Sequence, residues 1–157
     1  MSRAARLLAA ARDAGALIAT AESCTAGLIA GAITEEAGSS DIFDRGFVTY
    51  SNAAKQQMLG VGARTLATHG AVSQEVAREM AEGALARSDA TLAVAVTGIA
   101  GPGGSEQKPE GRVCFGLAQK GQTTRTETVD FGALGRSQVR AATVTHALDL
   151  LLGALKA

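Results

Sequence analysis

The feature that most constrains the fold is an apolar run at residues 91–97, TLAVAVT. The run is continuous and contains β-branched side chains, a pattern typical of a strand that is buried on both faces. The sheet that contains such a strand must therefore be covered by other elements on both sides. A glycine-rich segment at residues 98–111, GIAGPGGSEQKPEG, follows the run directly.

The remaining patterns predict helices and strands that alternate along the first half of the chain. Helices are predicted at residues 3–14, 24–36, 51–59, 62–68, 73–88 and 136–155, and further strands at 16–20, 43–50, 112–119 and 123–131. Gly15 is expected to end the first helix, Ser51 or Asn52 to cap the third, and Ser73 to cap the helix that follows it. Alternation favours parallel pairing with helices on both faces, and a hairpin at 120–122 adds one antiparallel pairing. We therefore expect an α/β fold, a three-layer α/β/α sandwich on a mixed, mostly parallel sheet of about five strands.

Length, charge and cysteine spacing limit the number of domains and the kinds of partner that this chain can have. With 157 residues, the chain is expected to form one domain spanning 1–157. Lys+Arg and Asp+Glu number 15 each, and a net charge of zero argues against nucleic acid as a partner. No apolar run reaches the roughly 18 residues of a membrane span, and charges interrupt the N-terminal segment, so neither a membrane partner nor a signal peptide is predicted. Cys24 and Cys114 form no metal-ligand spacing, which favours a cytoplasmic protein with free thiols and no bound metal.

Three polar stretches lie where predicted strands end. They are residues 22–25, residues 49–51 together with Lys55, and residues 97–101. Ligands of open α/β sheets bind beyond the carboxyl ends of the strands. The three stretches are therefore expected to converge on one crevice.

The first stretch contains two candidate nucleophiles. A hydroxyl at Ser23 or Thr25 could cap the following helix, and spacing alone favours that role for Ser23. Ser23 would equally suit a nucleophile, because the start of the helix supplies backbone donors for an oxyanion. Cys24 is a rival, although a small buried cysteine is the commoner case. Glu22 could orient Lys55 or act as a structural hydrogen-bond acceptor.

The other two stretches offer a base and an anion site. Lys55 could act as a general base only if burial or a nearby cation lowers its pKa, and Tyr50 could place its hydroxyl at the rim. Gly98 and Gly101 allow backbone N–H groups to point at an anion without interference from a Cβ atom. Arg136 and Arg140, four residues apart on the last helix, could clamp a phosphate or could simply face solvent. The residues alone leave both interpretations open, a functional site or ordinary surface and loop positions.

Several long segments match one family in order along the chain. The segments AESCTAGLIA, GSSDIFDRGFVTYSNAAKQQMLGV, HGAVSQEVAREMA and VTGIAGPGGSEQKPEG resemble the competence-damage-inducible protein (CinA) C-terminal domain family, over about residues 6–150. The chain has no room for the separate N-terminal domain of longer members, so it resembles the stand-alone form. That form is similar to nicotinamide-nucleotide amidohydrolase, and the resemblance implies hydrolysis of nicotinamide mononucleotide (NMN) to nicotinate mononucleotide and ammonia.

The resemblance also implies roles for individual residues. Ser23 is the expected nucleophile, Lys55 its base, and Tyr50 an aid to proton transfer. The substrate is expected to be held by Thr97, the glycine segment and an arginine, Arg136 with Arg140 as the fallback. Glu22 could hold a ribose hydroxyl of that substrate. Members are cytoplasmic, require no cofactor or metal, and are usually homodimers, so a homodimer is expected here.

Three positions differ from the family pattern. Ala26 stands where the family usually has glycine, the loop GPGG is one residue shorter than the usual GPxGG, and Glu110 replaces a small apolar residue. These differences motivate an alternative, a non-catalytic nucleotide-binding module with a regulatory role. A third hypothesis is a structural or partner-binding domain, in which the polar strand ends act only as caps.

Overall fold

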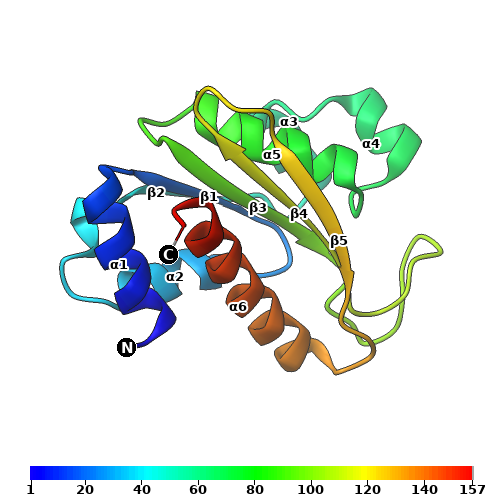
Figure 1. The fold of residues 1–157 in the computed structure, drawn as a ribbon. Helices are drawn as coiled ribbons and strands as arrows, with labels where there is room; N and C mark the ends of the chain where they lie inside the picture. Colours follow the sequence, from blue (N-terminus) through cyan, green and yellow to red (C-terminus); the bar gives the residue numbers. More distant parts are fainter. Residues whose placement is uncertain (157) are drawn as a thin grey trace.

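The computed structural model describes residues 1–156 of the chain. Its helices are α1 (Arg3–Ala14), α2 (Leu28–Thr34), α3 (Asn52–Leu59), α4 (Ala63–His69), α5 (Gln74–Ala86) and α6 (Arg136–Ala154), with a 3₁₀ turn, η1, at Ser39–Asp41. Its strands are β1 (Ile18–Glu22), β2 (Phe43–Val48), β3 (Leu92–Gly98), β4 (Arg112–Gln119) and β5 (Arg125–Asp130). Helices α1, α2 and α6 cover one face of the sheet and α3, α4 and α5 the other (Figure 1). The predicted three-layer α/β/α fold is confirmed.

The order of strands across the sheet is β2-β1-β3-β4-β5. Strand β1 pairs in parallel with both β2 and β3, whereas β3–β4 and β4–β5 are antiparallel. The sheet is therefore mixed as predicted, but it contains two antiparallel pairings instead of the one expected from the hairpin. The second arises because the glycine-rich segment joins β3 to β4 without a helix, and a connection without a crossover brings the next strand back antiparallel.

Local signals located most element boundaries. Gly15 ends α1 in the left-handed conformation, and the hydroxyls of Ser51 and Ser73 accept from Ala54 N and Val76 N at the starts of α3 and α5. Helix α2 was expected to start near residue 24 but starts at Leu28. The intervening turn contains two residues with positive φ, Ala26 at 46° and Gly27 at 99°, and this backbone conformation cannot continue a helix.

The central strand is covered on both faces, as the apolar run predicts. Val94 and Val96 belong to the core shared with α1, α2 and α6, and Ala93 and Ala95 belong to the core shared with α5. The small side chains on the second face allow α5 to approach the sheet closely. A Cβ atom on Gly116 of β4 would lie only 2.4 Å from the carbonyl oxygen of Ala77. Glycine is therefore required at position 116 for the helix to pack at this distance.

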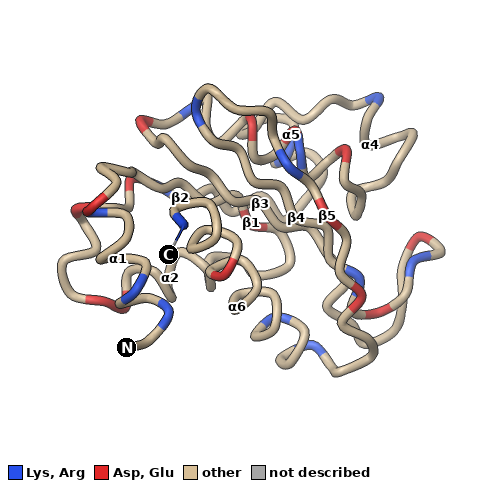
Figure 2. Tube along the Cα trace, viewed as in Figure 1, with Lys and Arg blue, Asp and Glu red and all other residues tan. Residues whose placement is uncertain are grey.

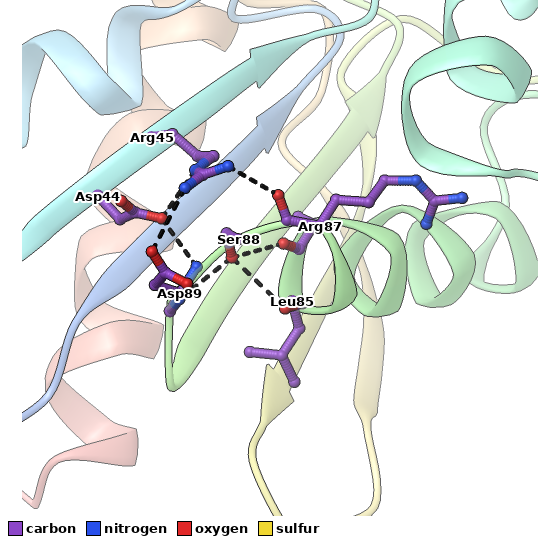
Figure 3. Close-up of polar contacts among 8 residues, drawn as sticks. Asp44, Arg45, Leu85, Arg87, Ser88 and Asp89 are labelled. Atoms are coloured by element: carbon purple, nitrogen blue, oxygen red, sulfur yellow. Dashed lines mark hydrogen bonds and ion pairs between the residues drawn. The ribbon is translucent and has the colours of Figure 1, made fainter.

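Charged residues of both signs are interspersed along the chain (Figure 2). One polar cluster ties the start of β2 to the connection between α5 and β3 (Figure 3). Arg45 donates to the Asp44 carboxylate at 2.8 Å and to the carbonyl of Arg87 at 3.1 Å, and Asp44 also accepts from the backbone N–H of Asp89. That backbone hydrogen bond, together with Arg45, lowers the pKa of Asp44. The cluster lies at the amino ends of the strands. Over residues 1–156, no helix has the length and apolar character needed to cross a bilayer.

Candidate active site

The carboxyl ends of three parallel strands are joined by backbone hydrogen bonds. Ser23, directly after β1, donates its N–H to the carbonyl of Val96 in β3 at 3.1 Å. Thr49, directly after β2, donates its N–H to the carbonyl of Glu22 at 2.9 Å. These bonds continue the sheet past its regular ends and bring the residues that follow each strand together. The expected convergence of the three polar stretches is thus present in the fold.

Lys55 and Ser23 meet at this edge of the sheet. Helix α3 directs the Lys55 side chain inward, and only 1% of this residue is exposed. Its Nζ lies 3.0 Å from Ser23 Oγ and 2.9 Å and 3.3 Å from the carbonyl oxygens of Thr49 and Tyr50. All three partners are neutral oxygen atoms. Burial therefore dominates, and it lowers the pKa of Lys55, with Cys24 and Glu106 acting weakly in the opposite direction.

This geometry suits a neutral amine as well as an ammonium group. An ammonium group would donate to all three oxygens. A neutral amine would donate to the two carbonyls and direct its lone pair at Ser23, whose hydroxyl could then donate to it. In that state Lys55 is placed to accept the proton of Ser23, which is the arrangement of an activated serine nucleophile.

Glu22 has a structural role in this site. Its carboxylate is 1% exposed and accepts from the Thr25 hydroxyl at 2.6 Å and from the N–H groups of Ile29 and Ala30 at 2.8 and 3.0 Å. It therefore caps α2 from the preceding strand, where a negative charge also complements the helix dipole. The expectation that Ser23 or Thr25 caps this helix is wrong, because α2 starts later and the Glu22 carboxylate bonds its free N–H groups.

Cys24 is poorly suited to act as the nucleophile. Its side chain is buried, and burial raises the pKa of the thiol to about 11. A thiol with such a pKa is almost entirely protonated at neutral pH, and the thiol form is a weak nucleophile. Of the two candidates in this turn, the geometry therefore favours Ser23.

A cavity of about 310 Å³ opens above the Ser23–Lys55 pair. Its wall is formed by the strand ends, the α4–α5 connection, the glycine-rich loop and the start of α6. The lining residues are Ser23, Cys24, Tyr50, Asn52, Lys55, Ala71, Val72, Thr97, Gly98, Ile99, Ala100, Gly101, Pro102, Gly103, Gly104, Ser105, Glu106 and Arg136. This volume lies at the lower end of the range for small-ligand sites. Within residues 1–156, no group of three or more His, Cys, Asp or Glu side chains is arranged to hold a metal ion.

The predicted residues of the glycine-rich loop line this cavity, but their contacts differ from expectation. The Thr97 hydroxyl donates to the carbonyl of Ala71 at 2.8 Å, so it links β3 to the α4–α5 connection. Gly98 is required by packing, since a Cβ atom there would lie 2.7 Å from the side chain of Val113. Gly101 has φ of 95°, which only glycine adopts without strain. Gly98 and Gly101 therefore shape the loop as well as exposing its backbone.

Tyr50 and Arg136 lie together at the rim. Tyr50 is 59% exposed, and its hydroxyl accepts from Arg136 Nη2 at 2.7 Å. Arg136 also donates to the carbonyl of Gly101 at 2.7 Å. The group of Tyr50 that meets Lys55 is its backbone carbonyl. Arg140 is outside the cavity wall, with only a long 3.5 Å contact to the carbonyl of Thr25, so Arg136 is the arginine that reaches the cavity.

Two residues that the sequence patterns did not single out hold the far side of the loop. Glu106 lines the cavity from a two-residue turn in which it and Gln107 have positive φ values of 52° and 65°. Lys108 donates to the carbonyls of His69 and Val72 and so ties the loop to the α4–α5 connection. Its partners are backbone atoms about 36 to 39 residues away, and no local pattern reports such a pairing.

A family model described as the CinA C-terminal domain matches residues 1–155. The chain belongs to the CinA C-terminal domain family. Its CinA domain is 52% identical to the competence/damage inducible protein CihA from Agrobacterium tumefaciens, whose crystal structure it matches with a TM-score of 0.94, over 99% of this chain and 94% of that chain. The competence damage-inducible protein A (ComA) from Klebsiella pneumoniae gives the same TM-score at 40% identity, over 98% and 95% of the two chains.

Curated relatives of this CinA domain fall into two groups by length. The nicotinamide-nucleotide amidohydrolase PncC of Enterobacter agglomerans is 51% identical over 92% of this chain and 88% of that protein. The PncC protein of Shigella flexneri is 52% identical over 87% and 83%. The CinA-like protein of Chlorobium phaeobacteroides (strain BS1) is 59% identical over 77% of this chain, but the match covers 30% of that protein. The chain thus spans about a third of the length of the first CinA-like relatives that it matches.

Proposed function

We propose that this protein hydrolyses the carboxamide of NMN to give nicotinate mononucleotide and ammonia. Two relatives more than half identical to the chain, matched over most of their length, are named nicotinamide-nucleotide amidohydrolase. The observation that carries the proposal for this chain is the buried Lys55 amine, 3.0 Å from the hydroxyl of Ser23 at the base of a cavity. A nucleophile with an adjacent base is the pair that cleavage of a carboxamide needs.

The first half of the proposed reaction forms an ester. Ser23 Oγ attacks the carboxamide carbon while neutral Lys55 takes the hydroxyl proton, and the carbonyl oxygen becomes an oxyanion. The oxyanion then collapses, the C–N bond breaks, and Lys55 returns its proton to the departing nitrogen, which leaves as ammonia. The nicotinoyl group remains as an ester on Ser23. A lysine can serve both steps because burial lowers its pKa and so favours the neutral form that accepts a proton.

The second half reverses the roles. A water molecule takes the place of ammonia and loses a proton to Lys55 as it attacks the ester carbon. Collapse of the second oxyanion breaks the bond to Ser23 Oγ, which recovers its proton from Lys55. The product is nicotinate mononucleotide, and the enzyme returns to its starting state. No other titratable side chain is needed for proton balance.

The rim of the cavity is proposed to hold the phosphate. Arg136 carries a guanidinium group next to the backbone of the glycine-rich loop, and this combination suits a phosphate group. Tyr50 is proposed to bind substrate beside Arg136, because its hydroxyl bonds to that residue. Tyr50 contacts Lys55 through its backbone carbonyl and not through its hydroxyl, so a part in proton transfer is not included in this mechanism. Thr97 is proposed to position the cavity wall through its bond to Ala71.

Ammonia release from NMN tests the proposal. Purified wild-type protein should release ammonia, and Ser23→Ala should lose activity by roughly 10⁴-fold or more, as when a nucleophile is removed. Cys24→Ala is the matched control, since it removes the neighbouring small side chain and should leave the rate within about threefold. A Ser23→Ala variant with a near-normal rate would overturn the mechanism. Saturable binding of NMN by wild-type protein without ammonia release would favour the non-catalytic binding module.

We further propose that the protein forms a homodimer in the cytoplasm. The oligomeric state is testable by sedimentation velocity over a range of concentrations, with a dimer of the 157-residue chain as the expected species. A monomer at all concentrations that also turns over NMN would show that one chain suffices for the site.

A further inference from the structure

The glycine-rich loop between β3 and β4 is fastened to the rest of the site by a carboxylate. Glu110 lies near the end of this loop. Its Oε1 accepts from the N–H of Gly103 at 2.8 Å, and its Oε2 accepts from the N–H of Gly135 at 2.9 Å. Gly103 is part of the loop, and Gly135 is the N-cap residue that directly precedes α6. One side chain therefore bonds two segments that are 32 residues apart in sequence.

A second pair of hydrogen bonds joins the same two segments. Arg136, the first residue of α6, donates to the carbonyl of Gly101 and to the hydroxyl of Tyr50. The loop and the helix start are thus held together in a closed ring: Glu110 bonds Gly103 and Gly135, and Arg136 bonds Gly101. The fit around Gly101 is tight, because a Cβ atom there would lie 2.5 Å from Cδ of Glu110.

Glu110 lies behind the surface that a substrate would touch. Gly101, Gly103 and Arg136 line the cavity, whereas Glu110 does not. Its carboxylate draws the N–H groups of Gly103 and Gly135 toward itself. Glu110 is therefore placed to influence a bound molecule through the loop and Arg136, without contacting that molecule itself.

We propose that Glu110 is a positioning residue that holds the glycine-rich loop and Arg136 in the arrangement that receives the anionic group of the substrate. The proposal rests on the function proposed above for this cavity. Each carboxylate oxygen of Glu110 accepts one of these hydrogen bonds, so replacement of Glu110 by alanine or by glutamine removes a known number of them. Alanine leaves both N–H groups without a partner, and glutamine can accept from only one, since its other terminal atom is a donor.

The kinetic signature follows from where the two parts of the site are anchored. Ser23 and Lys55 are held by the strand ends and α3, so they should keep their geometry when the loop loosens. A loosened loop must be ordered when the substrate binds, and that cost weakens binding. Loss of Glu110 should therefore raise KM for NMN and leave kcat nearly unchanged.

The experiment compares Glu110→Ala and Glu110→Gln with matched variants of Glu79. Glu79 also bonds with both oxygens, to the N–H of Gly62 and the hydroxyl of Thr65, but it lies outside the cavity wall. We expect KM to rise roughly tenfold for Glu110→Ala and roughly threefold for Glu110→Gln, with kcat within about twofold. Glu79→Ala and Glu79→Gln should leave KM unchanged.

Amide hydrogen exchange gives a readout that does not depend on turnover. Glu110→Ala should speed exchange at Gly103 and Gly135, and Glu79→Ala should speed it at Gly62 only. An unchanged KM, a fall in KM, or a loss confined to kcat would overturn the proposal; a fall is the result expected if the carboxylate merely repelled the phosphate. If Glu110→Ala fails to fold, the KM and exchange of Glu110→Gln decide in the same way.

The two proposals can fail separately. If wild-type protein releases no ammonia from NMN, the proposed activity is wrong, and calorimetric binding of NMN to wild type and Glu110→Ala then replaces KM. If wild type is active and both Glu110 variants bind NMN as tightly as wild type does, the positioning role is wrong while the activity stands.

Discussion

Replacement of Lys55 by methionine separates the chemistry of the site from its packing. Methionine has nearly the same length and can occupy the same buried position, but it cannot accept a proton. The Lys55 amine is 3.0 Å from Ser23 Oγ, within the distance at which a general base acts. A positioned base contributes about 10²–10⁴-fold to the rate, which corresponds to about 2.7–5.4 kcal/mol of barrier. We expect Lys55→Met to lower kcat/KM for NMN by a factor in this range.

The pH dependence gives a second, independent measure. The wild-type kcat/KM should rise with pH as Lys55 loses its proton, because only the neutral amine can act as a base. Burial lowers the pKa of Lys55 in the folded protein, so the unfolded chain binds this proton more tightly. Between the folded and unfolded pKa values, the free energy of unfolding should therefore rise with pH by up to about 1.4 kcal/mol per pH unit. Below the folded pKa both states carry the proton, and the slope disappears.

Urea unfolding and ammonia release between about pH 6 and pH 10 would test both expectations. The measured quantity is the difference in unfolding free energy between wild type and Lys55→Met at each pH, because this difference cancels the titration of all other groups. Lys120→Met, in the exposed β4–β5 turn, is the control and should change neither activity nor the slope. Retained activity in Lys55→Met, or a difference in stability that does not vary with pH, would refute the assignment of Lys55 as a buried base.

Three further predictions concern other parts of the site and fold. Glu22→Gln should destabilise the protein by about 1–3 kcal/mol in urea unfolding, since one N–H of α2 loses its acceptor; a higher KM at unchanged stability would instead place Glu22 on the substrate. Arg136→Lys should raise KM for NMN roughly tenfold, because the planar guanidinium with its fork of donors is lost. Arg140→Lys should change KM by less than about twofold. A larger rise in KM for Arg140→Lys than for Arg136→Lys would assign phosphate binding to Arg140. Gly116→Ala should lower unfolding free energy by roughly 1–3 kcal/mol, because its Cβ would lie 2.4 Å from the carbonyl of Ala77; unchanged stability would show that α5 can shift at little cost.

Much of the fold was accessible from local patterns. The run at 91–97 predicts a strand covered on both faces, and β3 occupies that position at the centre of the sheet. Ser51 and Ser73 were expected to cap helices and do so, because such a cap depends on an N–H only three residues away. The cap of α2 was missed for the complementary reason. Its acceptor, Glu22, lies seven and eight residues before the N–H groups it bonds, across a turn with two positive φ values.

The amino-acid sequence by itself therefore determined the layers of the fold, most of the elements and the three strand ends that meet at the site. Tertiary structure alone decided which groups face one another there. Lys55 reaches Ser23 across 32 residues, and Arg136 rather than Arg140 reaches the loop, although the two arginines are one helical turn apart. Periodicity reports the face on which a side chain lies, because it reflects the geometry of one element. The distance between side chains of different elements depends on how those elements pack, and burial of the Lys55 amine, with its lowered pKa, is a consequence of that packing.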